Sequence, residues 1–338
     1  MNSRPASESN IRQQVVDVAH SLVGDTTRLA QELPALSLEQ IDDRMDTLFA
    51  DSLRQLDALG LRGPANQTPS SILWDIAAEQ LQEGSLQTHA RLKPHGYAGD
   101  YEMLYRICTF DVRGSELGAA FDRFFQRQAA PQAVRNRTRL MASHITQLAA
   151  ASNSPLKVVS IGSGPAFDLC LAAERLAGDN LPCPHFVLVD IDPHALDFAQ
   201  EQLGNWVSDD HVQLERANLF RLPKLKSLQE RLSDADMIFC TGLFDYLDAG
   251  QAATLLRALR NCTHDSGEVY VFNFAHGNPS RAYMEWLGNW YRTYRSVDDL
   301  WDMAAQAGIA SDQCEVDAEP TGVNLYLRAW RESHRQLY

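Results

Sequence analysis

Glycines and an acid follow two apolar runs of the sequence in an order that suits a nucleoside. The run VVSI is followed by Gly162, Ser163 and Gly164, a spacing that lets the backbone turn tightly and approach a ligand at the start of the next helix. Asp190 ends a second apolar run, where a carboxylate can accept hydrogen bonds from both hydroxyls of a ribose. This order predicts a nucleoside-binding crevice.

Three more residues extend the predicted crevice. Ile191 comes directly after Asp190, and Asn218 and Leu219 follow a third apolar run, where an amide and an apolar side chain suit the edge and the face of an adenine. Each feature also has a plainer interpretation, since the glycines could serve only a tight turn, Asp190 could be a solvated strand end and Asn218 a turn residue. Ala166 breaks the G-x-G-x-x-G fingerprint, which disfavours a nicotinamide dehydrogenase.

Three expected loops carry side chains that could move a proton or orient a substrate. The residues that we predict as catalytic are His95, Tyr97, Asp245, Tyr246 and His276. Their polar neighbours in the same loops are Lys93, Asp100, Tyr101, Asn273 and Asn278. The plainer interpretation makes the first loop, KPHGYAGDY, a structured turn with a helix cap at Asp100, and makes the two histidines ordinary loop residues.

Two arginines and a set of aromatic residues are further candidates. Arg135 and Arg137 could each pair with a carboxylate of a bound cofactor or of a substrate, or could lie on a solvated helix face; we assign Arg135 to cofactor binding. Four aromatic residues with helical spacing could form either a core-facing stripe or an apolar wall for an acyl or aromatic substrate: Trp286, Trp290, Tyr291 and Tyr294.

The elements that must position these residues fall into two halves. Apolar residues have helical spacing over residues 10–150, whereas after Ser154 short runs rich in Val, Ile and Phe alternate with helical segments. Fully apolar strands separated by helices indicate a parallel sheet that is covered on both faces. We therefore expect an all-helical domain over residues 1–152 that acts as a lid, and an α/β domain over residues 153–338.

Charge and composition narrow the partners of the 338-residue chain. Thirty Lys and Arg against 44 Asp and Glu give a formal net charge of −14, which disfavours nucleic acid and anionic membrane surfaces as partners. The sequence has no apolar run of the ~18 residues that a membrane span needs, and no C-x-x-C pair for a structural metal. We expect a cytoplasmic protein without a metal that acts on a small-molecule substrate, and a homodimer stays open.

The motifs together resemble a known family. VVSIGSGPAFD, VLVDIDPHALDFA, ERANLF and DMIFCTGLFDYL are similar to the ordered motifs of class I S-adenosylmethionine-dependent methyltransferases, over roughly residues 155–330. The resemblance implies a Rossmann-like methyltransferase sheet and S-adenosyl-L-methionine as the cofactor. It also implies that Gly162 and Gly164 approach the methionine moiety, that Asp190 holds the ribose and that Asn218 or Leu219 meets the adenine. Ala166 stands where the family usually has glycine.

A narrower resemblance concerns the substrate. KPHGYAGDYEML, AVRNRTRL, GLFDYL and MEWLGNWYRTYRS are similar to the bacterial extracellular-factor proteins that make hydroxy-fatty-acid methyl esters, which implies carboxyl O-methylation of an acyl chain. A carboxylate acceptor is already ionised at neutral pH and needs orientation rather than a base, whereas a phenol or amine would more often need one. The alternatives are an O- or N-methyltransferase acting on a hydroxyl, phenol or amine, and a non-catalytic S-adenosylmethionine-binding interaction protein.

Overall fold

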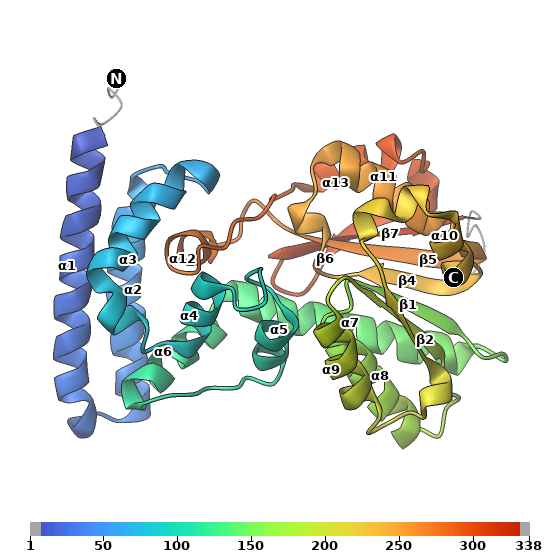
Figure 1. Cartoon of the computed structure of the whole chain (residues 1–338), viewed down its shortest axis with the longest axis horizontal. Helices are drawn as coiled ribbons and strands as arrows, with labels where there is room; N and C mark the ends of the chain where they lie inside the picture. The colour runs from blue at the N-terminus through green and yellow to red at the C-terminus, as the bar shows by residue number, and fades with distance from the viewer. Residues whose placement is uncertain (1–7, 332–338) are drawn as a thin grey trace. The chain divides into compact units, whose positions relative to one another are not determined.

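The structure is a computed structural model that describes residues 8–331. These residues form two compact units, one of residues 8–131 with 279–291 and one of residues 132–278 with 292–331 (Figure 1). The sequence-based boundary at 152/153 differs from this division, because most of the helix before it groups with the sheet and residues 279–291 group with the helices. The lid role of the helical unit stays a prediction.

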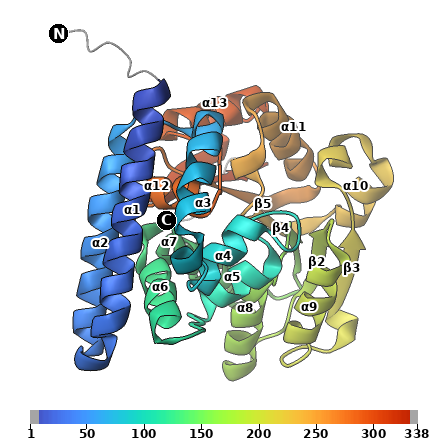
Figure 2. The ribbon, with the colours of Figure 1, turned by 60° about the vertical axis from the view of Figure 1, so that its left-hand side comes forward.

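The helical unit confirms the predicted helical N-terminal region. Its helices are α1 (Glu8–Glu32), α2 (Leu38–Ala58), α3 (Gln67–Leu81), α4 (Ser85–Leu92), α5 (Tyr101–Cys108), α6 (Glu116–Arg127) and α12 (Arg281–Trp286). The two long helices α1 and α2 lie side by side (Figure 2). Aromatic rings join α2 to α6 and α12: Phe49 stacks on Phe124 with centroids 4.3 Å apart and meets Tyr283 edge to face with centroids 5.5 Å apart. Residues far apart in sequence thus share one core.

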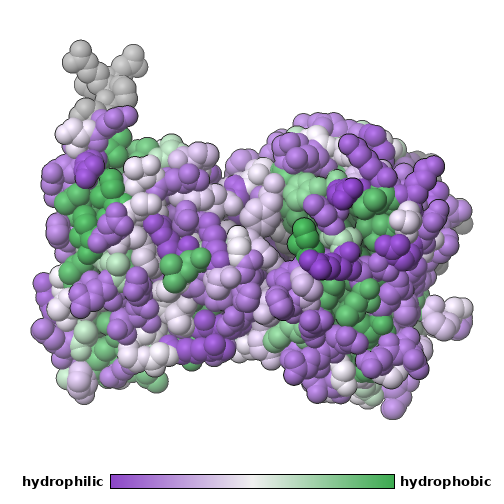
Figure 3. Space-filling model, viewed as in Figure 1, coloured by the Kyte–Doolittle hydropathy of each residue, from purple (hydrophilic) through white to green (hydrophobic). Residues whose placement is uncertain are grey.

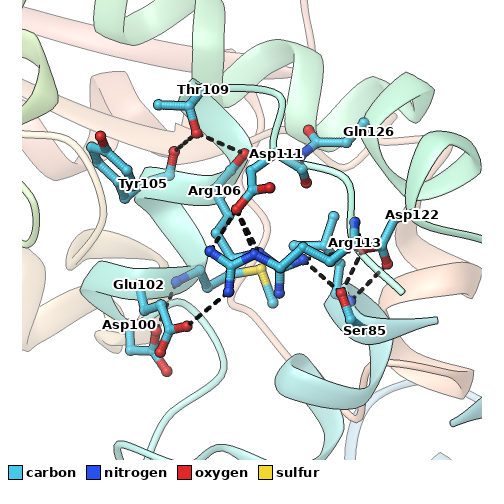
Figure 4. A network of polar contacts seen from close by, with 12 residues as sticks. Ser85, Asp100, Glu102, Tyr105, Arg106, Thr109, Asp111, Arg113, Asp122 and Gln126 are labelled. Carbon is cyan, nitrogen blue, oxygen red and sulfur yellow. Dashed lines mark hydrogen bonds and ion pairs between the residues drawn. The ribbon is translucent and has the colours of Figure 1, made fainter. Parts of the chain in front are cut away.

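A buried carboxylate, Asp122 of α6, joins several segments of this unit. It accepts hydrogen bonds from Ser85 Oγ at 2.5 Å, from the backbone N–H of Leu86 at 2.9 Å and from the backbone N–H of Arg113 at 3.1 Å (Figure 4). Arg106 of α5 forms an ion pair with it at 3.1 Å. Asp122 is 0% exposed, so this network compensates a charge that water does not reach.

The second unit confirms the predicted Rossmann-like sheet. Its seven strands are β1 (Lys157–Ile161), β2 (His185–Asp190), β3 (Val212–Arg216), β4 (Ala235–Cys240), β5 (Thr263–Phe274), β6 (Cys314–Ala318) and β7 (Asn324–Trp330). They lie in the order β3-β2-β1-β4-β5-β7-β6, with β1 to β5 parallel and β7 antiparallel to both neighbours. The strand order reverses between β1 and β4, and ligands of such sheets bind at the carboxyl ends of the strands around that point.

Helices cover both faces of the sheet, which is why its central strands are apolar throughout. Alternate strand residues such as Val158, Leu188 and Phe272 pack with α7 (Ala129–Ala151), α8 (Phe167–Gly178) and α9 (Pro193–Leu203). The residues between them, such as Val159 and Val189, pack with α10 (Lys226–Leu232), α11 (Ala249–Arg260) and α13 (Val297–Gln306). Across residues 8–331, no helix combines the length and apolar character that a membrane crossing requires.

The aromatic residues at 286–294 do not form the single helical stripe that their spacing suggests. Helix α12 ends at Trp286, and the residues that follow are not helical. Trp286 and Trp290 are buried in the helical unit, whereas Tyr294 is buried in the sheet unit. These side chains therefore belong to two cores.

Candidate active site

A direct contact joins the carboxyl ends of β1 and β2. The backbone N–H of Gly164 donates to Asp190 Oδ2 at 2.9 Å, and that of Asp192 donates to Asp190 Oδ1 at 3.0 Å. The N–H of Gly162 donates to the carbonyl of Val189 at 2.8 Å. The structure thus brings the predicted glycine turn and the predicted acid together, while their roles toward a ligand stay predictions.

The turn after β1 uses the left-handed conformation three times. Gly162 and Gly164 have φ angles of 63° and 51°, and Ala166, the residue before α8, has a φ of 49°. An L-residue pays about 1–2 kcal/mol for this conformation, which gives a physical reason for glycine at position 166 in related sequences. A Cβ placed on Gly162 would meet no atom within 4 Å, so space lies open in front of the turn.

Two polar side chains of this edge are suited to hydroxyl groups of a ligand. Ser163 Oγ is buried and has no hydrogen-bond partner among residues 8–331, so a ligand there would satisfy it. Burial raises the pKa of Asp190, while hydrogen bonds from the N–H groups of Asp192, Gly164 and Ile191 act in the opposite direction. Each carboxylate oxygen of Asp190 still has a lone pair to accept from a hydroxyl.

Large hydrophobic side chains stand exposed after successive strands. Ile191 follows β2 and is 55% exposed, Phe220 follows β3 and is 54% exposed, and Tyr246 follows β4 and is 41% exposed. Figure 3 shows that hydrophobic side chains reach the surface of the sheet unit in patches among hydrophilic ones. An exposed apolar side chain directly after Asp190, that of Ile191, suits the face of an adenine ring.

Asn218 and Leu219 start a short 3-10 helix, Leu219–Lys224, after β3. Asn218 Oδ1 accepts a hydrogen bond from the N–H of Phe220 at 3.0 Å, so the turn role that the sequence allowed for Asn218 is present. Leu219 is buried in the core on one face of the sheet. Contacts of these two residues with an adenine stay predictions.

Sequence reasoning missed Asp168, a buried acid in the first turn of α8. Its Oδ1 accepts from the N–H of Leu169 at 2.9 Å, and burial raises the pKa of its carboxyl to about 6 although the charge of Arg137 opposes this. A lone acid in an apolar helix start gives little sequence signal, because the same residue type serves as an ordinary favourable charge at a helix N-terminus.

The structure places Arg137 at the strand ends, while cofactor binding by Arg135 stays a prediction. Arg137 of α7 is 2% exposed, its Cζ lies 5.9 Å from the ring centroid of Phe274, and a Cβ placed on Gly242 would lie 3.8 Å from its Nη2. Its positive charge also opposes the rise in the pKa of Asp245, beyond the end of β4, that burial causes. Arg135 Nη2 instead donates to Gln132 Oε1 along the helix at 3.0 Å.

Asp168→Asn is expected to stabilise the protein at neutral pH. Burial raises the pKa of Asp168 from 3.8 to about 6, so between pH 3.8 and pH 6 the folded state holds a proton that the unfolded state releases. The stability that this proton contributes is present below pH 3.8 and is lost as the pH rises through about 6. Asparagine mimics the protonated form, so urea unfolding at pH 7.5 should show a gain of about 1–2 kcal/mol, since one pKa unit corresponds to ~1.4 kcal/mol. The gain should vanish near pH 4, and a variant that is less stable than the parent at pH 7.5 would contradict this reading.

The predicted catalytic residue Asp245 is a fully enclosed carboxylate. Its Oδ1 accepts from the N–H of Phe274 at 2.7 Å, and its Oδ2 pairs with Arg292 Nη1 at 2.5 Å. Burial raises its pKa, and the charge of Arg292 is the largest opposing influence. Arg292 also lies over the rings of Phe274 and Tyr246, with Cζ 4.7 Å and 5.1 Å from the centroids. Asp245 thus holds two strand-end loops together. Of the two residues predicted as catalytic after β4, Asp245 and Tyr246, only Tyr246 is accessible.

The structure separates the polar residues that were expected together in a loop after β5. Asn273 lies within β5 instead and is buried, where its Nδ2 donates to the carbonyl of Thr293 at 2.8 Å and its Oδ1 accepts from Arg295. Asn278 is also buried. The side chain of His276 is 59% exposed, with Nε2 3.5 Å from Asp299 Oδ2. A histidine in this position is in contact with solvent rather than enclosed in a pocket.

Asp100, in the loop 93–101 of the helical unit, pairs with His89 of α4, a contact that the sequence did not single out. Asp100 Oδ1 accepts from the N–H of Met103 at 2.9 Å, which is the expected helix cap, and Asp100 Oδ2 lies 2.7 Å from His89 Nε2. His95 Nε2 lies 3.4 Å from Glu102 Oε2. No local spacing rule links positions 89 and 100, because the pair forms only when α4 and the loop fold back on each other.

The other candidates of this loop lie close by. The ring centroids of His95 and Tyr101 are 4.8 Å apart. Lys93 ends α4 in the left-handed conformation, and burial and the charge of Arg91 lower its pKa. Tyr97 is half-buried in the same loop. Catalytic roles for His95 and Tyr97 stay predictions.

Comparisons with known proteins agree with this geometry. Residues 159–269 match the family model of a methyltransferase domain, and no curated protein matches the sequence. Among solved structures, a possible exported protein from Bordetella parapertussis has a TM-score of 0.56 at 17% identity, with 82% of this chain and 92% of that chain covered. At this identity the likeness shows the fold.

Two further solved structures are methyltransferases. The S-adenosylmethionine-dependent methyltransferase SibL, in its apo form, is 16% identical, with a TM-score of 0.48 and coverage of 94% of this chain and 96% of that chain. Magnesium protoporphyrin IX methyltransferase from Synechocystis, with bound S-adenosylhomocysteine, is 14% identical, with a TM-score of 0.46 and coverage of 68% and 93%. The matched region runs from within β1 to within β5 and includes the glycine turn, so residues 159–269 resemble a methyltransferase domain.

Proposed function

We propose that S-adenosylmethionine binds at the carboxyl ends of β1, β2 and β3. The contact between Gly164 and Asp190 carries this proposal, because it joins a turn that a ligand can approach to a carboxylate that can accept from a ribose. The unpartnered Ser163 Oγ and the open space before Gly162 fit a ligand at the same edge. The cofactor supplies an electrophilic methyl group on a sulfonium.

We further propose that Arg137 and Asp168 hold the amino-acid part of the cofactor. That part carries a carboxylate and an ammonium group, and these two buried side chains offer one charge of each sign, close enough that the charge of Arg137 opposes the rise in the pKa of Asp168 that burial causes. We propose Arg137 for the role that the sequence analysis gave to Arg135, because the side chain of Arg137 lies at the strand ends.

Arg137→Gln is expected to separate two cofactor analogues. S-adenosylhomocysteine has the amino-acid carboxylate and methylthioadenosine lacks it, so the variant should bind the first about 10- to 30-fold more weakly, as expected for a lost charge-assisted hydrogen bond of roughly 1.5–2 kcal/mol. Methylthioadenosine should bind as it does to the parent. Arg135→Gln is the matched control, because its guanidinium bonds to Gln132 along the same helix. Calorimetry measures both, and equal weakening for the two analogues would contradict the assignment.

For the acceptor we propose a small carboxylic acid that becomes a methyl ester. The buried side chains of Arg137, Arg292 and Arg295 gather near the ends of β4 and β5, beside the acids Asp168 and Asp245. A guanidinium at this edge can pair with an acceptor carboxylate. An oxygen of the acceptor carboxylate forms the new C–O bond to the methyl carbon. The S–C bond breaks at the same time, and the electron pair of the S–C bond returns to sulfur. The protein's part is to orient the acceptor and exclude water. The resemblance to makers of hydroxy-fatty-acid methyl esters also supports this acceptor.

A matched set of acceptors tests this proposal. Decanoate, 1-decanol and decylamine share an apolar chain and differ in the head group, and each is incubated with methyl-labelled S-adenosylmethionine. We expect label only in methyl decanoate, and base hydrolysis of this ester should release the label as methanol. The rate should be nearly flat above pH 6, since the acceptor is already ionised. Label in an ether or an amine, with none in the ester, would exclude carboxyl methylation.

A hydroxyl, phenol or amine acceptor is the second candidate function, and such an acceptor would more often need a base than a carboxylate does. In this case, a pH–rate profile should show an essential group. The same profile for His95→Ala and His276→Ala tests the two histidines predicted from the sequence.

We propose that the enzyme works in the cytoplasm on a small molecule, as its negative net charge and lack of paired C-x-x-C cysteines suggested. The Bordetella protein, in contrast, is described as a possible exported protein, which would place that protein outside the cytoplasm. Fractionation of cells that express the enzyme decides between the two compartments. Light scattering of the purified enzyme shows whether it is the homodimer that the sequence left open.

A further inference from the structure

A second cluster of charged side chains lies away from the strand ends, beneath the middle of α7. His144 of α7 contacts Glu268 of β5 through Nε2, and the Tyr270 hydroxyl lies 3.0 Å from the same nitrogen. Arg328 of β7 pairs with Glu268 Oε2 at 2.7 Å through Nη2. Glu268 is buried, and although burial alone would raise its pKa, the contacts with His144 and Arg328 lower it.

This cluster and Arg137 lie on the same face of one helix. His144 follows Arg137 by seven residues, which is close to two full turns and about 10 Å along the axis. The apolar side chains of α7 that pack on the sheet, among them Met141 and Ile145, make contacts without a preferred direction. The His144–Glu268 contact is directional and therefore fixes the register of α7 against β5.

We infer that His144, held by Glu268, is a positioning residue that places the guanidinium of Arg137 for the cofactor's carboxylate. This inference rests on the proposed function, which gives Arg137 that role. The side chain of His144 lies against the middle of β5, whereas that of Arg137 lies over Phe274, at the end of the strand. The effect of His144 on cofactor binding therefore passes through α7, the helix that carries both side chains.

His144→Ala is expected to weaken binding of S-adenosylhomocysteine about fivefold and to leave methylthioadenosine binding unchanged. The variant should fold, because His144 borders an open groove of about 500 Å³ with Arg139 and Tyr326, so water can take the place of the imidazole. A loss that falls equally on the two analogues would indicate a general structural role and overturn the inference, as would no loss at all.

Double variants and a control make the test specific. If His144 acts through Arg137, His144→Ala should add nothing to Arg137→Gln, whereas independent effects would multiply and contradict the inference. Arg137→Gln alone tests the proposed function. If this variant weakens the binding of both analogues equally, the assignment of Arg137 to the cofactor's carboxylate is wrong, and the positioning role of His144 is wrong with it. The control is His264→Ala, which breaks a comparable His264–Asp236 contact of 3.0 Å at the other end of β5 and should change neither affinity.

Discussion

Asp190→Ala is expected to weaken binding of S-adenosylhomocysteine by about 1000-fold. The variant should lose the two charge-assisted hydrogen bonds that we propose between Asp190 and the ribose, each worth roughly 1.5–3 kcal/mol, and a total near 4 kcal/mol corresponds to about three factors of ten. It also leaves the N–H groups of Gly164 and Asp192 without their acceptor, so the turn that should face the ligand loosens. Isothermal calorimetry with the parent and the variant measures the change.

Asp192→Ala is the matched control for this experiment. Asp192 is two residues from Asp190 and caps α9, where its Oδ1 accepts from the N–H of His194 at 2.9 Å. Its removal should cost about 1 kcal/mol of helix stability and change the affinity by no more than a few fold. If Asp190→Ala binds as tightly as Asp192→Ala, the ribose role of Asp190 is wrong.

The sheet and the glycine turn could be predicted from the sequence because their signals are local. The runs that became β1, β2, β4 and β5 are apolar on both faces, as strands buried between two helical layers must be. Gly162 and Gly164 were informative because both adopt positive φ angles that other residues resist. Ala166 departed from the family pattern and nevertheless adopts the glycine-like conformation.

What the sequence did not reveal depends on contacts between distant segments. Arg135 and Arg137 are two residues apart and so point in different directions from the helix, and only the packing of α7 on the sheet decides which one reaches the strand ends. Asp245 was a candidate because it is an acid in a strand-end loop, yet Arg292, 47 residues later, occupies its carboxylate. The partner of Asp100, His89, and the helical grouping of residues 279–291 have no local pattern either.

Asp122→Ala is expected to destabilise the helical unit by about 4 kcal/mol, since removing one partner of a buried ion pair leaves the other charge without compensation. Arg106 is 3% exposed and would lose its closest carboxylate, and the N–H groups of Leu86 and Arg113 would lose their acceptor. Urea unfolding followed by circular dichroism, with the midpoint and slope fitted separately, measures the loss.

Asp111→Ala is the control for Asp122→Ala. Asp111 also contacts Arg106, at 3.5 Å, and pairs with Arg113 at 2.6 Å, but its side chain is partly exposed. Partly exposed ion pairs contribute about 1 kcal/mol or less, so this variant should stay close to the parent. Similar losses in the two variants would contradict the account of Asp122 as the centre of the network.

The most direct test of the cofactor site is a crystal structure of the enzyme with S-adenosylhomocysteine. We expect the two ribose hydroxyls within hydrogen-bond distance of the Asp190 carboxylate, the turn at Gly162 against the amino-acid part, and the ligand carboxylate at Arg137. A nucleoside bound away from the ends of β1 and β2, with Asp190 facing only water, would contradict the account.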